Sequence, residues 1–477
     1  MVSRLDRAMA RVSDSPLRYG NELRLLENGP TTYVDWLAEI RSAERWVHLE
    51  NYIFRADEIG HRFADALSAK AREGLPVRVL YDWFGSMDVP RSFWEGLRRS
   101  GVDVRAVNPP ALQAPLDFLR RDHRKLLTVD GAYASAGGVC IADTWLRRSP
   151  ETDLPYRDTA VSVRGPAVAD LERAFAGVWD EAGKPLPDEE RPEVGDIPSA
   201  GEMQARVVIQ EPGKARILRV LQFLMAEVEE RMWIADAYFL SVPGLTQAVM
   251  AAARDGVDVR ILLPATNDLP WIGFLSRIGY HQLLESGVRI YEYGGLMMHA
   301  KTSVTDGLWG RVGSTNLNLS GLLANWEVDI LAEDQSFGTK MEEMFEEDLD
   351  DAREIFLGGT PRRPRAVPER RISRAERRVQ RQTPGSGPRA VATASSLGSA
   401  VLTDSGAPLR THQSKIGAAL AAGALGVSAL GVRHPRLLAW PLAAATGFAG
   451  TLGLVHAAQS AWSKRERYAG LRRQGRP

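Results

Sequence analysis

Hydrophobic and polar positions along the chain follow two periods in regular succession, which predicts alternating strands and helices. Two segments, beginning at Arg45 and Arg231, each contain a strand, a helix and a second strand. Apolar residues in the two helical parts recur at spacings of three and four, as expected of a helix with one buried face. These residues are Ile59, Phe63 and Leu67 in the first copy and Leu245, Val249 and Ala252 in the second.

A glycine follows each of these helices. Gly74 and Gly256 are expected to end them, because glycine adopts the left-handed conformation of a helix C-terminus without strain. After each glycine, apolar and other residues alternate in segments 77–80 and 257–263, which predicts a strand. The same order of elements therefore occurs twice.

An earlier helix is expected over about 33–44, opened by a capping box of Thr32 and Asp35. The succession of strands and helices predicts an α/β fold made of two repeats, 1–200 and 201–357, each a central β-sheet flanked by helices.

The repeat is strongest in two short motifs. The sequence HRKLLTVDGAYASAGGVC begins at His123, and HAKTSVTDGLWGRVGSTN begins at His299. Each contains His-x-Lys followed five residues later by Asp, and a single such match arises by chance at about one in 10⁵ positions. All paired positions lie 176 residues apart, so two matches in one register are not accidental. The paired residues are His123, Lys125 and Asp130 in the first copy and His299, Lys301 and Asp306 in the second.

These residue types suit chemistry on a phosphate. An imidazole can attack or donate a proton through one nitrogen while a carboxylate holds the other, so two histidines can supply a nucleophile and an acid. A lysine two residues further along a strand points to the same face as the histidine. Lys125 and Lys301 thus supply two positive charges for phosphate oxygens, and Ser314 and Asn316 add neutral donors.

Other residues have simpler interpretations. Asp130 and Asp306 each precede a glycine, and we favour a structural role in a turn over a catalytic role. His48, His61 and His281 are assigned no role. A metal site is disfavoured, because His-x-Lys offers one ligand where metal sites need three or four, and lysine repels a cation.

Charge is distributed unevenly along the 477 residues. The chain has 60 basic and 60 acidic residues, but segment 361–477 has 18 arginines and 2 lysines against 3 glutamates and 1 aspartate. This segment therefore carries a charge of +16 and segment 1–360 a charge of −16. Cys140, the single cysteine, excludes a disulfide framework and is expected to be a small buried side chain.

The C-terminal part differs in kind from the rest. An Arg-rich, then Pro-, Gly- and Ser-rich linker is predicted over 358–414, a membrane helical hairpin over 415–462 and a basic tail over 463–477. The basic residues would contact an anionic membrane surface. A hairpin that packs on the body instead remains an alternative. The N-terminus, with its early charges, does not resemble a secretory signal.

The motifs together resemble the phospholipase D superfamily and, within it, the bacterial cardiolipin synthase branch. The matching stretches cover about 18–356 and include NYIFRADEIGHRFADAL, RVLYDWFGS, HRKLLTVDG, YRDT, LLESGVRIYEY, HAKTSVTDG and VGSTNLN, with Asn-Trp-Glu at 325–327. The resemblance implies two repeats related by a pseudo-two-fold axis, with the site between them. It also implies an enzyme at a bacterial inner membrane with phospholipids as substrates. The basic residues that flank the predicted hairpin favour cytoplasmic ends for it, which would place the catalytic body in the cytoplasm.

The resemblance implies a two-step exchange that needs no metal or other cofactor. His123 would form a phosphohistidine, and His299 would protonate the leaving alcohol and deprotonate the incoming one. Glu327 and Asp158 would each orient an imidazole. Cardiolipin would be made from phosphatidylglycerol and a second phosphatidyl donor.

Four positions depart from a symmetrical or typical site. Cys140 stands where the second copy has Asn316, so only one copy has the amide. Gly138, the counterpart of Ser314, is a candidate for substrate binding together with that serine. Asn318 and Ser320 replace an acidic and a basic residue common in the branch, which leaves the lipid substrate open.

Two other functional classes are compatible with these motifs. One is a phospholipase D-type hydrolase or nuclease; a nuclease should have a basic groove, and the charge of −16 on the body is unfavourable for nucleic acid. The other is a membrane-tethered binding protein with a degenerate site, which the intact histidines and lysines disfavour. Trp83, Phe84, Trp271 and Phe274 are candidates for an apolar rim that excludes water, or for core residues.

Overall fold

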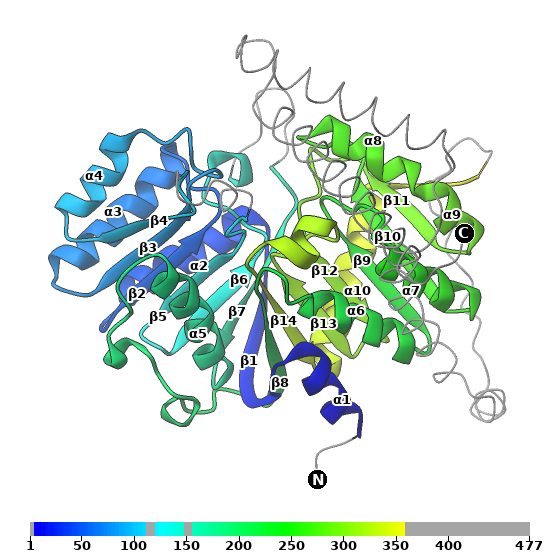
Figure 1. The fold of residues 1–477 in the computed structure, drawn as a ribbon, viewed down its shortest axis with the longest axis horizontal. Coiled ribbons are helices and arrows are strands. Elements are labelled where there is room, and N and C mark those ends of the chain that lie inside the picture. The colour runs from blue at the N-terminus through cyan, green and yellow to red at the C-terminus, as the bar shows by residue number, and fades with distance from the viewer. Residues whose placement is uncertain (1–3, 111–119, 147–154, 358–477) are drawn as a thin grey trace, which may run out of the picture. The chain divides into compact units, whose positions relative to one another are not determined.

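The computed structural model describes residues 4–110, 120–146 and 155–357, and their strands form one large mixed sheet with helices on its faces (Figure 1). The first seven strands are β1 Arg18–Glu27, β2 Val47–Asn51, β3 Val77–Asp82, β4 Asp103–Val107, β5 Lys125–Val129, β6 Tyr133–Gly137 and β7 Thr159–Arg164. The others are β8 Met203–Gln210, β9 Arg231–Ala235, β10 Asp258–Pro264, β11 Arg289–Tyr293, β12 Thr302–Thr305, β13 Trp309–Gly313, β14 Glu327–Glu333 and β15 Ala352–Ile355.

The strand order repeats about a central pair. From β1 outward the order is β1-β7-β6-β5-β2-β3-β4, and from its neighbour β8 outward it is β8-β14-β13-β12-β9-β10-β11, followed by β15. Adding seven to each label of the first series gives the second. The strands β2, β3 and β4 are parallel, as are β9, β10 and β11, whereas the inner strands are antiparallel. The internal repeat of the sequence is thus matched by strand topology.

Ten α-helices occur in the described residues and cover the sheet. They are α1 Arg4–Ser13, α2 Asn28–Ser42, α3 Glu58–Arg72, α4 Arg91–Arg99, α5 Ala167–Glu181, α6 Arg216–Glu227, α7 Pro243–Arg254, α8 Pro270–Ile278, α9 Tyr280–Glu285 and α10 Gln335–Asp350. Short 3-10 helices lie at Asp143–Trp145, Asp188–Glu190 and Val194–Asp196, and a short π-helix at Ser320–Ala324.

Three apolar clusters hold these layers together. One joins α2, α3 and α4 to the sheet of the first half, and a second joins α1, α6, α7 and α9 to that of the second half. The third contains residues of both α5 and α10, such as Phe175 and Phe337, and spans the two halves. Because this cluster runs across the β1–β8 junction, it fixes how the halves meet.

Most of the helix predictions are confirmed. The six periodic residues of α3 and α7 are buried, and Gly74 and Gly256 follow these helices with φ of 93° and 95°. The predicted capping box is wrong. Helix α2 begins at Asn28, its N-cap Glu27 accepts no side-chain bond, and Thr32 lies inside the helix and donates to the Asn28 carbonyl.

Asp35 also has another role, since its carboxylate contacts Arg24 and the Tyr133 hydroxyl. Its contacts are to strands β1 and β6, which explains why local spacing misled the prediction. The expected hairpin over 415–462, with the linker and basic tail around it, lies outside the described residues. Among the helices that the structure describes, none is long and apolar enough to cross a membrane.

Candidate active site

The two His-x-Lys segments are held by loops of opposite halves. His123 precedes β5, and its backbone N–H donates to the carbonyl of Trp326, just before β14, at 3.0 Å. His299 precedes β12, and its N–H donates to the carbonyl of Arg157, just before β7, at 2.7 Å. These backbone bonds place each histidine beside a loop of the other repeat.

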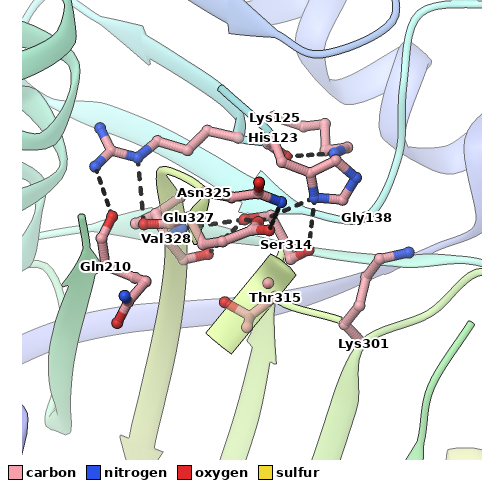
Figure 2. A network of polar contacts seen from close by, with 12 residues as sticks. His123, Lys125, Gly138, Gln210, Lys301, Ser314, Thr315, Asn325, Glu327 and Val328 are labelled. Carbon is pink, nitrogen blue, oxygen red and sulfur yellow. Dashed lines mark hydrogen bonds and ion pairs between the residues drawn. The ribbon is translucent and has the colours of Figure 1, made fainter. Parts of the chain in front are cut away.

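A buried carboxylate orients the ring of His123. Its Nδ1 lies 3.0 Å from Glu327 Oε2 and 3.1 Å from the Ser314 carbonyl oxygen, as Figure 2 shows. Glu327 is fully buried and accepts bonds from Ser314 Oγ at 2.5 Å and from Asn325 Nδ2 at 3.2 Å. Two acceptors at Nδ1 require the proton there, which leaves Nε2 with a free lone pair.

The arrangement at His299 is similar but uses different residues. Its Nδ1 lies 2.7 Å from Asp158 Oδ2, and the same oxygen accepts the Trp145 indole N–H at 2.8 Å. The other oxygen, Oδ1, accepts the Thr159 backbone N–H at 2.8 Å. Asp158 is therefore fixed at both oxygens, and it holds the imidazole through Nδ1.

The histidine–carboxylate pairs cross between the repeats. His123 of the first repeat pairs with Glu327 of the second, and His299 of the second pairs with Asp158 of the first. Neither repeat therefore contains a complete histidine–carboxylate pair. The docking of the two halves is a condition for orienting either ring.

The two lysines add positive charge to this site. Each donates to the backbone carbonyl of its own histidine, and Lys301 Nζ also lies 3.0 Å from His299 Nδ1. Burial, with a further contribution from Lys301, lowers the pKa of His299 to about 3. Burial also lowers the pKa of His123, and the charges of Lys125 and Lys301 act in the same direction.

The charges of both lysines act on both histidines, which indicates a single site. Burial lowers the pKa of Lys301 to about 8. Burial would raise the pKa of Asp158, but His299 and Lys301 more than offset it and keep that pKa below its usual value. Without substrate, both imidazoles are therefore neutral near pH 7, and the charges of Lys125 and Lys301 are balanced by those of Asp158 and Glu327.

Aromatic residues that the sequence analysis did not single out line both histidines. The Tyr52 ring centroid lies 4.7 Å from that of His123, and that of Tyr238 lies 5.9 Å from His299. Trp145 packs edge-on against His299 at 5.1 Å. The signal available in the sequence was a tyrosine shortly after the corresponding strands β2 and β9, in NYIF and DAYF.

A buried ion pair supports the loop after β13 and was also missed. Arg311 Nε donates to Asp329 Oδ2 at 2.5 Å, and its Nη2 donates to the Thr315 carbonyl at 2.8 Å. Asp329 Oδ1 accepts the N–H groups of Ser314 and Thr315 and the Thr315 hydroxyl. These contacts fix the backbone that carries Ser314 and Asn316.

The aspartates of the two motifs contact backbone rather than the site. Asp130 accepts the N–H groups of residues 44–46, and Asp306 accepts those of residues 229–231, at 2.7–2.9 Å. Both have positive φ, 58° and 51°, in the turn after β5 or β12. These contacts fit the structural role suggested by the sequence.

The remaining candidates lie around the two carboxylates. A Cβ on Gly138 would lie 2.0 Å from Asp158 Oδ1, so this position must lack a side chain for Asp158 to occupy its place. The Ser314 hydroxyl donates to Glu327 Oε2. Asn316 Oδ1 is buried and has no hydrogen-bond partner among the residues that the structure describes. This oxygen can therefore accept a hydrogen bond from a ligand. Cys140 is fully buried, as predicted.

Comparisons with known proteins match most of the chain to one family. Residues 222–349 match a family model described as cardiolipin synthase, PLD-like domain. Cardiolipin synthase of Geobacillus sp. (strain WCH70) is 33% identical over 365 residues, 75% of this chain and 72% of that protein. Cardiolipin synthase A of Pseudomonas fluorescens is 34% identical over 354 residues, 73% of each.

A solved structure supports the fold. The phosphatidylserine synthase of Haemophilus influenzae superposes with a TM-score of 0.57 at 15% identity, over 74% of this chain and 92% of that one. At this identity the likeness concerns the fold alone. The sequence matches carry the assignment: the chain belongs to the cardiolipin synthase family of the phospholipase D superfamily, and it is a phosphatidyltransferase.

Proposed function

We propose that the protein makes cardiolipin from phosphatidylglycerol and a second phosphatidyl donor, through a phosphohistidine intermediate. The observation that carries the proposal is the crossed pairing of two buried histidines with two buried carboxylates, beside two buried lysines. This arrangement supplies a nucleophile, an acid and positive charge at one place. The cardiolipin synthases that the chain matches support the choice of lipid.

In the first step, Nε2 of His123 attacks the phosphorus of the donor. The new P–N bond forms as the bond to the headgroup oxygen breaks, and His299 gives its proton to that oxygen, so the headgroup leaves as an alcohol. The phosphodiester anion that enters between Lys125 and Lys301 offsets their charge and raises the pKa of His299, so this ring can be protonated. The lysines stabilise the negative charge on phosphorus-bound oxygens.

In the second step, a hydroxyl of phosphatidylglycerol loses its proton to His299 and attacks the phosphohistidine. The P–O bond forms as the P–N bond breaks, which frees His123 and yields cardiolipin. Water in place of the lipid alcohol would yield phosphatidic acid. The ratio of the two products therefore measures how well the site selects a lipid acceptor.

The proposal includes the arrangement of the chain. Segments 1–200 and 201–357 are two repeats about a pseudo-two-fold axis, an interpretation supported by the seven-strand offset in topology and the 176-residue offset of the motifs. The segment 415–462 is proposed as the membrane tether. No metal enters the reaction, so a chelator is expected to leave the rate unchanged.

A rapid quench tests the mechanism directly. Protein is mixed with phosphatidylglycerol labelled in the phosphatidyl phosphate, stopped after short times, and examined for acid-labile label on histidine. We expect label on His123, and more of it in the His299→Ala variant, where breakdown is slowed. His123→Ala should carry none, and turnover should be nearly abolished in both variants, because nucleophile and acid act as a unit. Absence of label in every variant would exclude covalent catalysis with phosphatidylglycerol as the donor.

A further inference from the structure

Helix α8 presents an apolar face to the outside. Of ten large hydrophobic side chains exposed in the described residues, four lie on this nine-residue helix. They follow the spacing i, i+3, i+4 and i+7, which places them in one stripe. These residues are Trp271, Phe274, Leu275 and Ile278, exposed by 41%, 66%, 42% and 63%. The opposite side of the helix, with Ile272 and Ser276, is buried.

The loop that precedes helix α8 is connected to the catalytic site by hydrogen bonds. Tyr238, whose ring packs edge-on against His299, donates its hydroxyl to Asp268 Oδ1 at 2.7 Å, two residues before α8. Asn267 Nδ2 donates to the Ala237 carbonyl at 3.0 Å, which ties the same loop to the segment after β9. Helix α8 therefore begins at the rim of the site, and in Figure 1 it lies beside β10 and β11.

Two other exposed apolar residues lie on loops at this rim. Leu319, 54% exposed, follows Asn318, whose Nδ2 donates to the Tyr238 carbonyl. Met87, 49% exposed, follows Ser86, whose hydroxyl donates to the carbonyl of Tyr52 beside His123. The residues that precede Leu319 and Met87 thus bond to the backbone of the two tyrosines that pack on the histidines.

We propose that the α8 stripe, with Leu319 and Met87, docks on the interface of an anionic phospholipid bilayer. This inference rests on the phosphatidyltransferase activity: the phosphate must reach two histidines exposed by only 7% and 4%, while its acyl chains remain apolar. A rim inserted at the headgroup level lets the headgroup enter without the acyl chains crossing water. Tryptophan and large aliphatic residues are the types that anchor helices at this level.

Charge supports a bilayer over a protein segment as the occupant. Segment 1–360 carries −16, yet α8 contains no carboxylate, and its only charged residue is Arg277. An anionic lipid surface would repel the body in general but not this helix. The stripe therefore orients the site toward the membrane, whatever further attachment the C-terminal segment provides.

The chain offers a clean probe of this surface, because its single cysteine, Cys140, is buried. Phe274→Cys, labelled with an environment-sensitive fluorophore, is mixed as the full chain with vesicles of phosphatidylglycerol and phosphatidylethanolamine that contain a nitroxide-labelled lipid. Tyr19→Cys is the matched control. Tyr19 is 57% exposed and lies near the start of β1. The other end of β1 adjoins Asp158, and the strand between Tyr19 and that end is roughly 25 Å long.

We expect the label at position 274 to shift to the blue and to be quenched by the nitroxide, and the label at 19 to do neither. A label at 274 that ignores vesicles overturns the proposal. So does a label that is already blue-shifted without vesicles and stays unquenched, because the stripe would then be covered by another segment or a second copy. If wild-type protein makes cardiolipin while the label stays silent, only the docking surface fails; if the label inserts but no lipid product forms, only the proposed function fails.

A second measurement separates docking from chemistry. The double variant Phe274→Glu/Ile278→Glu should bind these vesicles about tenfold less well or worse, with a matching fall in rate on bilayer lipid at limiting vesicle concentration. Its rate on a short-chain phosphatidylglycerol dissolved as monomers should equal that of wild type. Tyr19→Glu should change neither value. Equal losses on both substrates would assign the stripe a structural role and refute docking.

Discussion

Gly138 provides a test of the crossed pairing that does not alter any reacting group. An alanine Cβ there would lie 2.0 Å from Asp158 Oδ1, whereas ordinary contacts begin at 3.4 Å, so the carboxylate must move by about 1.4 Å. It cannot move freely, because Trp145 and the Thr159 N–H hold its two oxygens. A shift of this size breaks the 2.7 Å contact with His299 Nδ1.

We expect Gly138→Ala to lower kcat by about 10²-fold, since a misplacement near 1 Å costs about that much. KM should change little, because the lysines that bind the phosphate are untouched. The same displacement removes a negative charge that raises the pKa of His299, so the alkaline limb of the pH–rate profile, where the acid loses its proton, should shift to lower pH. A role of Gly138 in substrate binding predicts the opposite pattern, with KM raised and kcat retained.

The assay measures transfer in phosphatidylglycerol vesicles, with products separated by mass spectrometry, alongside thermal unfolding. Gly177→Ala is the matched control, because a Cβ at this position in α5 meets no atom within 4 Å. It should retain full activity and gain up to about 1 kcal/mol of stability. A folded Gly138→Ala protein with kcat within a few-fold of wild type would refute the argument that the position of Asp158 controls the acid.

Two further predictions concern stability. His48 is fully buried, and its Nδ1 lies 2.8 Å from Glu172 while its Nε2 lies 2.9 Å from Glu190. Burial lowers the pKa of His48, but the two carboxylates outweigh burial, so the pKa is raised. His48→Asn should therefore destabilise the protein by about 3–5 kcal/mol in urea unfolding at pH 6, while kcat of the folded protein is retained. An unchanged urea midpoint would contradict a charged His48 between Glu172 and Glu190. Because the pKa of His299 falls from 6.5 to about 3 on folding, the unfolded chain binds a proton that the native protein does not, and stability is lost as pH falls below 6.5. Between pH 7.5 and pH 5 the stability of wild type relative to His299→Ala should fall by about 2 kcal/mol, and a constant difference would show that the ring has the same pKa in the native protein as in the unfolded chain.

The elements that sequence predicted well depend on neighbours along the chain. The buried face of α3, the ends of helices at Gly74 and Gly256, and the two His-x-Lys pairs follow from spacing alone. The failed capping box shows the limit, because Asp35 bonds to residues on β1 and β6 that no local pattern identifies. Tyr52 and Tyr238 were overlooked for the same reason: each matters through a histidine more than 60 residues away.

The pairing of carboxylates with histidines depends on contacts at still longer range. Glu327 lies 204 residues from His123, and Asp158 lies 141 residues before His299. The sequence offered both carboxylates, but only the docking of the halves decides which ring each one holds. The 176-residue offset shows that the motifs are duplicated and leaves open whether each copy serves its own histidine.

The crossing has a consequence for how the two halves depend on each other. If each histidine had its carboxylate within its own repeat, a shift between the halves would change the distance between two intact acid–base units. Here the same shift pulls Glu327 from His123 and Asp158 from His299 at once, and leaves carboxylates that are fully buried without their partners. The contacts that orient the two catalytic rings are thus also contacts between the repeats, so orientation of the rings depends on the docking of the repeats. Mutations in the shared cluster of α5 and α10 should therefore reduce activity before they unfold the chain.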